Sequence, residues 1–131
     1  MVIDTSAIVA ILFNEPEAMS LVHAISAAPI RLVAAPTLVE ASAVLLARKG
    51  PSGEVALDAL LQRLSLVTIA MSPESAACAR EAFRRFGKGV GSPRVLNYGD
   101  CLAYGVAMAT GNPLLFKGND FAQTDIAVAA Y

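Results

Sequence analysis

Four acidic residues stand at junctions between expected strands and helices, and their type and placement could support metal chemistry. Asp4 directly follows the apolar pair Val2-Ile3 at the start of the chain. The other three lie further along at comparable junctions, and they are Glu40, Asp100 and Asp120. In an open parallel sheet such junctions share one edge, which is where ligands bind. The pattern therefore predicts that four carboxylates converge.

Converging carboxylates need protons or a cation. Two unit charges about 4 Å apart repel by about 4 kcal/mol at an effective dielectric of 20, so either some protons stay on or a cation lies among the acids. Oxygen ligands without nearby Cys or His indicate Mg²⁺, with Mn²⁺ as a substitute, rather than zinc. Such an ion beside a basic patch is suited to hydrolysing a phosphodiester bond.

Two of the acids and three residues near Asp100 also have a structural interpretation. Asp4 could cap the helix that follows it, and Thr37-x-x-Glu40 fits the pattern of a capping box. Asn97 could cap a helix or contact a substrate. Tyr98 could pack in the core or stack on a base, and the core interpretation is the one we favour from the sequence. Cys101 is expected to be a small buried residue.

The basic residues are concentrated in one segment. Five of the ten Lys and Arg residues lie between positions 80 and 94, where the only acid is Glu81. A chain that is acidic elsewhere can hold a cation in one place and a polyanion in another. The candidates for substrate binding are Arg84, Arg85, Lys88, Arg94 and, further along, Lys117. A merely solvated face is the alternative.

The elements that would position these residues alternate along the chain. Strands are expected at 2–3, 30–34, 66–70, 114–116 and 126–130. Helices are expected at 6–13, from Pro16 to about Ala27, from Ala35 to Gly50, at 54–65, at 72–86 and from Asn97 to Thr110. Alternation of this kind predicts an α/β domain with a mostly parallel sheet.

Length and composition add further expectations. At 131 residues, the chain is expected to form a single domain over 1–131. Its hydrophobic content of 56% predicts a well-filled interior and a buried homodimer interface. No run approaches the ~18 apolar residues of a membrane span, and we expect no signal peptide and no membrane association. Two distant cysteines without metal-ligand spacing fit a cytoplasmic protein with reduced thiols.

Several stretches in combination resemble a known family. They are Val2-Ile3-Asp4-Thr5-Ser6, the helix opening at Glu40, Tyr98-Gly99-Asp100-Cys101-Leu102-Ala103-Tyr104 and Leu114-Leu115-Phe116-Lys117-Gly118-Asn119-Asp120-Phe121. Over essentially its whole length the chain resembles a PIN-domain ribonuclease, and more narrowly a VapC-type toxin. The resemblance implies a PIN-like three-layer α/β/α fold. It also implies a dimeric Mg²⁺-dependent endoribonuclease acting on structured RNA, silenced by a VapB-type antitoxin.

The resemblance also assigns roles. Asp4, Glu40 and Asp100 match the family's three core acids, and Ser6 matches the hydroxyl residue that supports the first. One departure concerns the fourth acid, because many members end in Thr-x-Asp and that aspartate aligns here with Gly118. Asp120 is the expected substitute as catalytic and metal-binding acid, and Asp125 is a second candidate.

Other proteins with this alternation fit less well. A phospho-receiver domain needs an acid after its third strand, where this chain has Ala70-Met71-Ser72. A dehalogenase-type phosphatase needs Asp-x-Asp, but Thr5-Ser6 follows Asp4, and the P-loop pattern is absent. The remaining alternative is a catalytically silent PIN-like module that binds RNA or a protein partner.

Overall fold

The computed structural model describes all 131 residues, and its sheet is entirely parallel. The strands lie in the order β3-β2-β1-β4, which confirms the expected parallel α/β architecture. The strand bounds are Val2–Ile3 (β1), Leu32–Ala34 (β2), Val67–Ile69 (β3) and Leu114–Leu115 (β4). The helix bounds are Thr5–Leu12 (α1), Ala18–Ala27 (α2), Ala35–Lys49 (α3), Pro51–Arg63 (α4), Pro73–Phe86 (α5) and Tyr98–Thr110 (α6).

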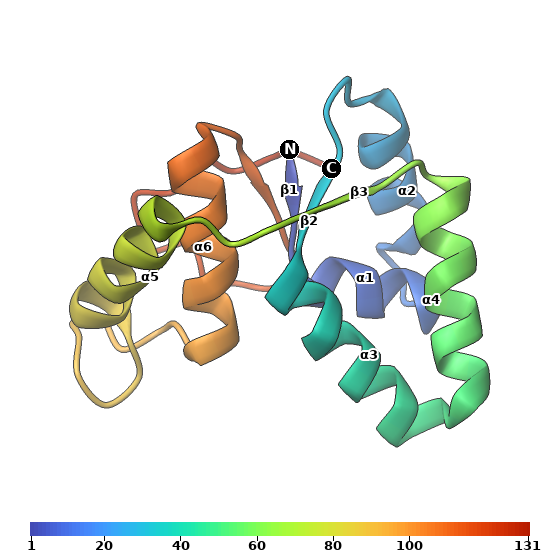
Figure 1. The fold of residues 1–131 in the computed structure, drawn as a ribbon, viewed down its shortest axis with the longest axis horizontal. Coiled ribbons are helices and arrows are strands. Elements are labelled where there is room, and N and C mark those ends of the chain that lie inside the picture. Colours follow the sequence, from blue (N-terminus) through green and yellow to red (C-terminus); the bar gives the residue numbers. More distant parts are fainter.

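The sheet separates two hydrophobic cores, because side chains alternate between its faces. Val2 and Leu114 join the core on the side of α5 and α6. Their neighbours Ile3 and Leu115 join the core packed by α1 to α4. Figure 1 shows these helices as two arms on either side of the short strands. The arrangement is the expected three-layer one.

Several element boundaries differ from expectation. The second helix begins only at Ala18, since Pro16 lies in a turn and Asn14 takes a positive φ of 52°. The fourth helix starts at once with Pro51 after Gly50, because proline suits a first helical turn. The expected strand at 126–130 is reduced to a single parallel bridge between Leu114 and Val128.

The capping residues can now be assigned. Asp4 caps α1, and Asn97 caps α6 in a capping box completed by Asp100. The capping box considered for Thr37 and Glu40 is wrong: α3 begins at Ala35 with Ala34 at its cap, three residues before Thr37, and it has no side-chain cap bond. Glu40 is therefore free of any capping role. No helix combines the length and apolarity that crossing a bilayer requires.

Candidate active site

Asp4 stands at the carboxyl end of β1 and is almost completely buried, with 3% of its surface exposed. One of its oxygens, Oδ2, accepts hydrogen bonds from the backbone N–H of Ser6 (2.9 Å) and from its hydroxyl (2.6 Å). Burial raises the pKa of Asp4, the two bonds from Ser6 oppose the rise, and the Glu40 carboxylate adds to it. Both Ser6 bonds leave the other carboxylate oxygen, Oδ1, for another partner.

Ser6 joins this acid to the end of the neighbouring strand. Its Oγ donates to Asp4 and accepts the backbone N–H of Lys117 at 2.9 Å. Lys117 follows β4, so one hydroxyl fixes the spacing between the ends of β1 and β4. Ser6 therefore lies where it can support Asp4, which is the role that the family resemblance implies for it.

Glu40 lies on α3 and is held by α1. Its Oε2 accepts a hydrogen bond from the Thr5 hydroxyl at 2.6 Å. A Cβ added to Gly99 would overlap the Glu40 carboxylate, so this carboxylate lies directly against the start of α6. Glu40 is consequently adjacent to the residue that precedes Asp100.

Asp100 is buried in the first turn of α6. Its Oδ2 accepts the backbone N–H of Asn97 at 2.6 Å, while its own N–H donates to Asn97 Oδ1 at 2.8 Å. Burial raises the pKa of Asp100 to about 6, and the Asp4 and Asp120 carboxylates add to the rise. The charges of Asp4 and Asp120 therefore act on Asp100, although the three residues are far apart in sequence or lie on different elements.

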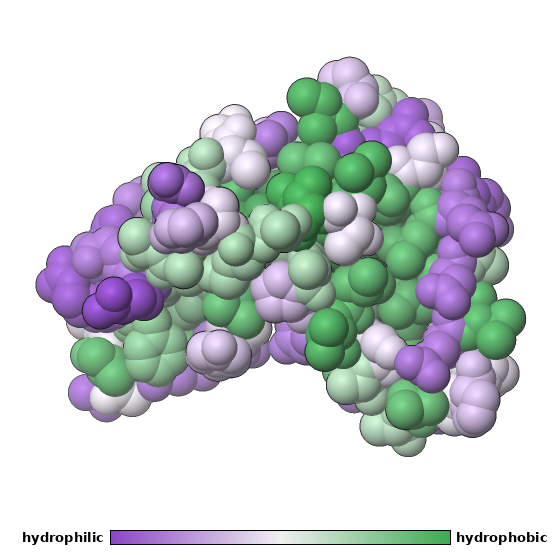
Figure 2. All heavy atoms as spheres, viewed as in Figure 1, coloured by the Kyte–Doolittle hydropathy of each residue, from purple (hydrophilic) through white to green (hydrophobic).

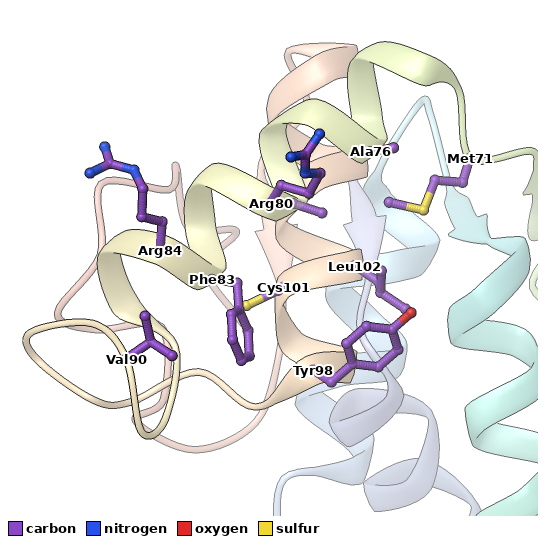
Figure 3. A pocket seen from close by; sticks show the side chains of 10 residues that line it. Met71, Ala76, Arg80, Phe83, Arg84, Val90, Tyr98, Cys101 and Leu102 are labelled. Carbon is purple, nitrogen blue, oxygen red and sulfur yellow. The ribbon is translucent and has the colours of Figure 1, made fainter.

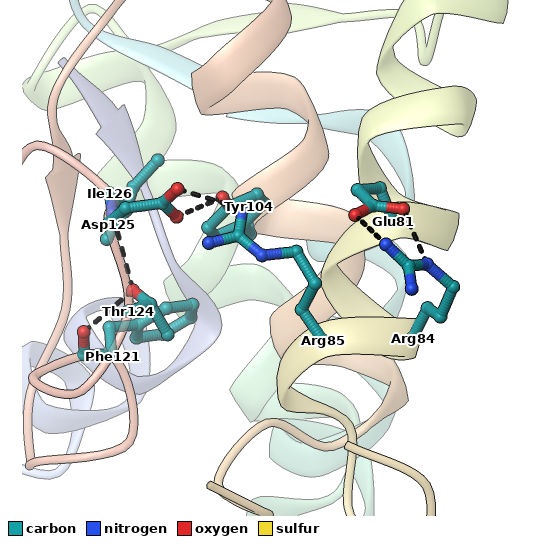
Figure 4. Close-up of polar contacts among 8 residues, drawn as sticks. All are labelled: Glu81, Arg84, Arg85, Tyr104, Phe121, Thr124, Asp125 and Ile126. Atoms are coloured by element: carbon teal, nitrogen blue, oxygen red, sulfur yellow. Dashed lines mark hydrogen bonds and ion pairs between the residues drawn. The ribbon is translucent and has the colours of Figure 1, made fainter. Parts of the chain in front are cut away.

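The two candidates for the fourth acid have different surroundings. Asp120 is exposed in the turn after β4, and its charge acts on Asp100. Asp125 instead accepts the hydroxyl of Tyr104 at 2.5 Å and pairs with Arg85 at 2.9 Å, as Figure 4 shows. Asp120 is therefore the candidate whose charge reaches Asp100, whereas Asp125 is bound to Tyr104 and Arg85.

The basic candidates are divided between paired and unpaired side chains. Arg84 pairs with Glu81, Arg85 with Asp125, and Lys117 with Glu15 and Glu17. Lys88 and Arg94 are exposed and belong to none of these ion pairs. The charge of Lys88 acts on Asp100, where it opposes the rise in pKa that burial causes. Lys88 is thus the basic candidate whose charge lowers the pKa of one of these acids.

Residues that the sequence did not single out as site residues also take part. Thr5 holds Glu40, and Gly99 gives room for it. Tyr98 is 73% exposed, so the expectation that it packs in the core is wrong. The motif Tyr98-Gly99-Asp100 contains both the aromatic ring and the glycine. Only the packing of α6 against α3 shows that Gly99 lies against Glu40 and that Tyr98 lines the space between the two helices. Cys101 is buried, as expected.

A hollow of about 430 Å³ lies between α3 and α6. Val39 and Glu40 line it from α3, and Tyr98, Gly99 and Leu102 line it from α6. Figure 2 shows the molecular surface notched between the two arms that carry these helices. A larger apolar hollow of about 570 Å³ lies on the other side of Tyr98, between α5 and α6 (Figure 3).

The acids fit a hard divalent cation by their chemistry. All the donors are carboxylate oxygens, and none of Asp4, Glu40, Asp100 and Asp120 belongs to an ion pair. No three of the chain's Asp, Glu, His and Cys side chains form a ready group around one point. Mg²⁺ is typically bound by one or two carboxylates together with water and substrate phosphates, so the donor set suits it without a closed protein cage.

Comparisons with known proteins agree with this fold. The model of the PIN domain matches residues 1–127. Ribonuclease VapC30 of Mycobacterium tuberculosis is 46% identical over 99% of this chain and 98% of its own. Ribonuclease VapC of Mycolicibacterium smegmatis is 45% identical over 97% of this chain and 98% of its own.

Solved structures share the fold at lower sequence identity. Mycobacterium tuberculosis VapC20, a toxin that cleaves the sarcin–ricin loop, superposes with a TM-score of 0.77 at 17% identity, over 96% of this chain and 95% of that one. VapBC2 from Rickettsia felis, bound to a promoter DNA fragment, superposes with a TM-score of 0.73 at 17% identity, over 97% of this chain and 94% of that one. The chain belongs to the PIN-domain family and, within it, to the VapC ribonucleases.

Proposed function

We propose that this protein is a Mg²⁺-dependent endoribonuclease and the toxin of a VapBC-like toxin–antitoxin system. The observation that carries the proposal is the electrostatic coupling of buried, unpaired acids from separate elements. Asp4 at the end of β1 and Asp100 on α6 both have raised pKa values because burial disfavours their charged forms. A cation bound at this edge of the sheet would neutralise the repulsion between the carboxylates, which explains why they are gathered without basic partners.

The roles of the residues follow from their surroundings. Asp4 and Asp100 would hold the ion, with Glu40 and Asp120 as outer acids that orient water. A bound Mg²⁺ supplies a coordinated water of lowered pKa and neutralises charge on the phosphate oxygens. Ser6 keeps Asp4 in one rotamer, and Thr5 does the same for Glu40 through the bond to its Oε2. Lys88 would attract the RNA backbone.

Cleavage of a panel of tRNA, rRNA and mRNA fragments tests the activity. We expect cutting with Mg²⁺ or Mn²⁺ and none in EDTA. Asp4→Asn and Asp100→Asn should each abolish cutting and weaken Mg²⁺ binding measured by titration calorimetry. Asp58→Asn, an exposed acid on α4, is the matched control and should change neither. Undiminished cutting in EDTA would rule out the metal mechanism, and RNA binding without any cutting would favour the silent binding module.

The partners are proposed on related grounds. A VapB-type antitoxin is proposed because VapBC2 of Rickettsia felis is a structural neighbour. A homodimer is proposed because α3 and α4 expose large apolar side chains such as Leu46 and Val55; Figure 2 shows apolar residues over this arm. Light scattering at micromolar concentration tests the dimer, and a monomer there would contradict it.

A further inference from the structure

Tyr98 and Val39 stand exposed on opposite sides of the hollow between α3 and α6. Tyr98 is 73% exposed and Val39 is 69% exposed, and both line this hollow. Water contact with so much apolar surface on two facing elements is unfavourable. An aromatic ring opposite an aliphatic side chain forms a slot suited to a flat, partly apolar group.

The slot lies next to one of the four acids. Glu40 lines it, and Asp100 lies in the same first turn of α6 as Tyr98. Gly99 leaves room for the Glu40 carboxylate at the base of the slot, because any larger residue there would overlap it. A base bound in the slot would therefore lie only a short stretch of backbone away from a phosphate bound at the acids.

We infer that Tyr98 is a stacking platform for one unpaired RNA base adjoining the scissile phosphate. This inference rests on the proposed ribonuclease activity. Single-stranded RNA is commonly recognised by stacking its bases on aromatic side chains, and stacking tolerates any base because each has a π-face. Val39 would cover the opposite face of the base. Leu102, which Figure 3 shows next to Tyr98, also lines the slot.

The surrounding charge favours RNA over an apolar peptide as the occupant. Lys88 acts on the Asp100 carboxylate, and Arg80 lines the hollow on the other side of Tyr98. A phosphate backbone passing the acids would meet these cations, whereas an apolar peptide needs neither. The base then lies in the slot while its phosphate remains at the acids.

Binding of a labelled single-stranded 12-nucleotide RNA, followed by fluorescence anisotropy in EDTA, tests the inference without relying on cleavage. Tyr98→Ala should weaken binding about tenfold, within the range for loss of one stacked base. Tyr98→Phe should bind within about twofold of wild type, since the ring is kept. Tyr131→Ala is the matched control, because Tyr131 is also exposed but lies at the end of the chain, and it should have no effect.

RNAs with a single abasic nucleotide at successive positions separate stacking from a structural effect. On wild type, one abasic position should weaken binding about tenfold, and on that RNA Tyr98→Ala should cause no further loss. Equal binding of intact RNA by wild type and Tyr98→Ala would overturn the inference. So would an equal loss by Tyr98→Ala on every abasic RNA, and so would failure of wild type to bind RNA.

Cleavage of the same RNAs distinguishes the two proposals. If wild type binds RNA with the expected Tyr98 dependence but does not cut it with Mg²⁺, the proposed nuclease activity fails while the stacking platform stands. If wild type cuts RNA but Tyr98→Ala binds and cuts equally well, the stacking platform alone fails.

Discussion

The Tyr104 hydroxyl donates a hydrogen bond to Asp125 at 2.5 Å and so ties α6 to the segment that carries Asp120. Arg85 on α5 binds the other oxygen of Asp125 and lies over the Phe86 ring. The hydrogen bond from Tyr104 and the Arg85 ion pair lower the pKa of Asp125. Three elements thus meet at one carboxylate (Figure 4).

Asp125 should accordingly matter for stability more than for chemistry. Asp125→Ala leaves the buried Tyr104 hydroxyl without its acceptor and should lower the free energy of unfolding by about 1–3 kcal/mol. Asp125→Asn keeps an acceptor oxygen and should cut RNA within a few-fold of wild type. Urea unfolding and single-turnover rates check both variants. If Asp125→Asn abolishes cleavage while remaining folded, Asp125 is the fourth acid.

Asp120 should behave as an outer acid. It is exposed, and its charge acts on Asp100 from outside the buried pair. Asp120→Asn should weaken Mg²⁺ affinity and slow cleavage, though less than Asp4→Asn does, because an outer acid more often orients water than binds the ion. Single-turnover rates across a Mg²⁺ titration measure both effects, and wild-type behaviour of Asp120→Asn would remove it from the site.

Gly99→Ala should separate activity from stability. The added methyl group displaces the Glu40 carboxylate, which is the end of a flexible side chain and can move without unfolding the protein. Alanine is also a better helix former than glycine, by up to about 1 kcal/mol. We expect an unchanged or higher melting temperature together with a loss of activity similar to that of Glu40→Gln. Full activity in Gly99→Ala would show that the position of Glu40 is unimportant.

The metal-free protein should lose stability as the pH rises from about 4 to 7. The pKa of Asp100 is about 6 in the folded chain against an ordinary value of 3.8, so the native state binds more protons than the unfolded state in this window. The buried Asp4, whose pKa is also raised, acts in the same direction. Calorimetric scans in EDTA should show the melting temperature falling over this range.

Asp100→Asn supplies the control for this pH dependence. Its amide oxygen can still accept the Asn97 N–H, so the cap is kept, and at pH 7 the metal-free variant should be more stable by about 1–2 kcal/mol. The opposite trend, with stability rising from pH 5 to 7 in both proteins, would contradict the burial of an ionisable Asp100. Because metal ligands must be deprotonated, Mg²⁺ binding to wild type should weaken below about pH 6.

The basic segment should contribute unequally to RNA binding. Lys88→Ala should weaken affinity and reduce the slope of log affinity against log salt by about 0.7 for a single-strand phosphate contact. Arg84→Ala should do less, because Arg84 is already paired with Glu81. Arg63→Ala on α4 serves as a control. An unchanged slope in Lys88→Ala would assign this lysine to a solvated face or to the antitoxin interface.

The sequence alone determined the features that depend on residues within a few positions of one another. Asp4 after two strand residues and Asp100 three residues after Asn97 could be placed from local patterns, because helix caps form over such short distances. The alternation of apolar runs likewise predicted an α/β domain with a parallel sheet. The exact start of α2 was not predictable, because a proline suits both a turn and a first helical turn.

Only the tertiary structure decided which groups meet across long separations in the chain. Lys117 pairs with Glu15 and Glu17, about a hundred residues away, and Asp125 is held by Tyr104 and Arg85. These contacts decide which basic side chains remain unpaired, and they bind Asp125 to other partners. The exposure of Tyr98 was decided in the same way, because burial depends on what packs against a side chain and not on its own type.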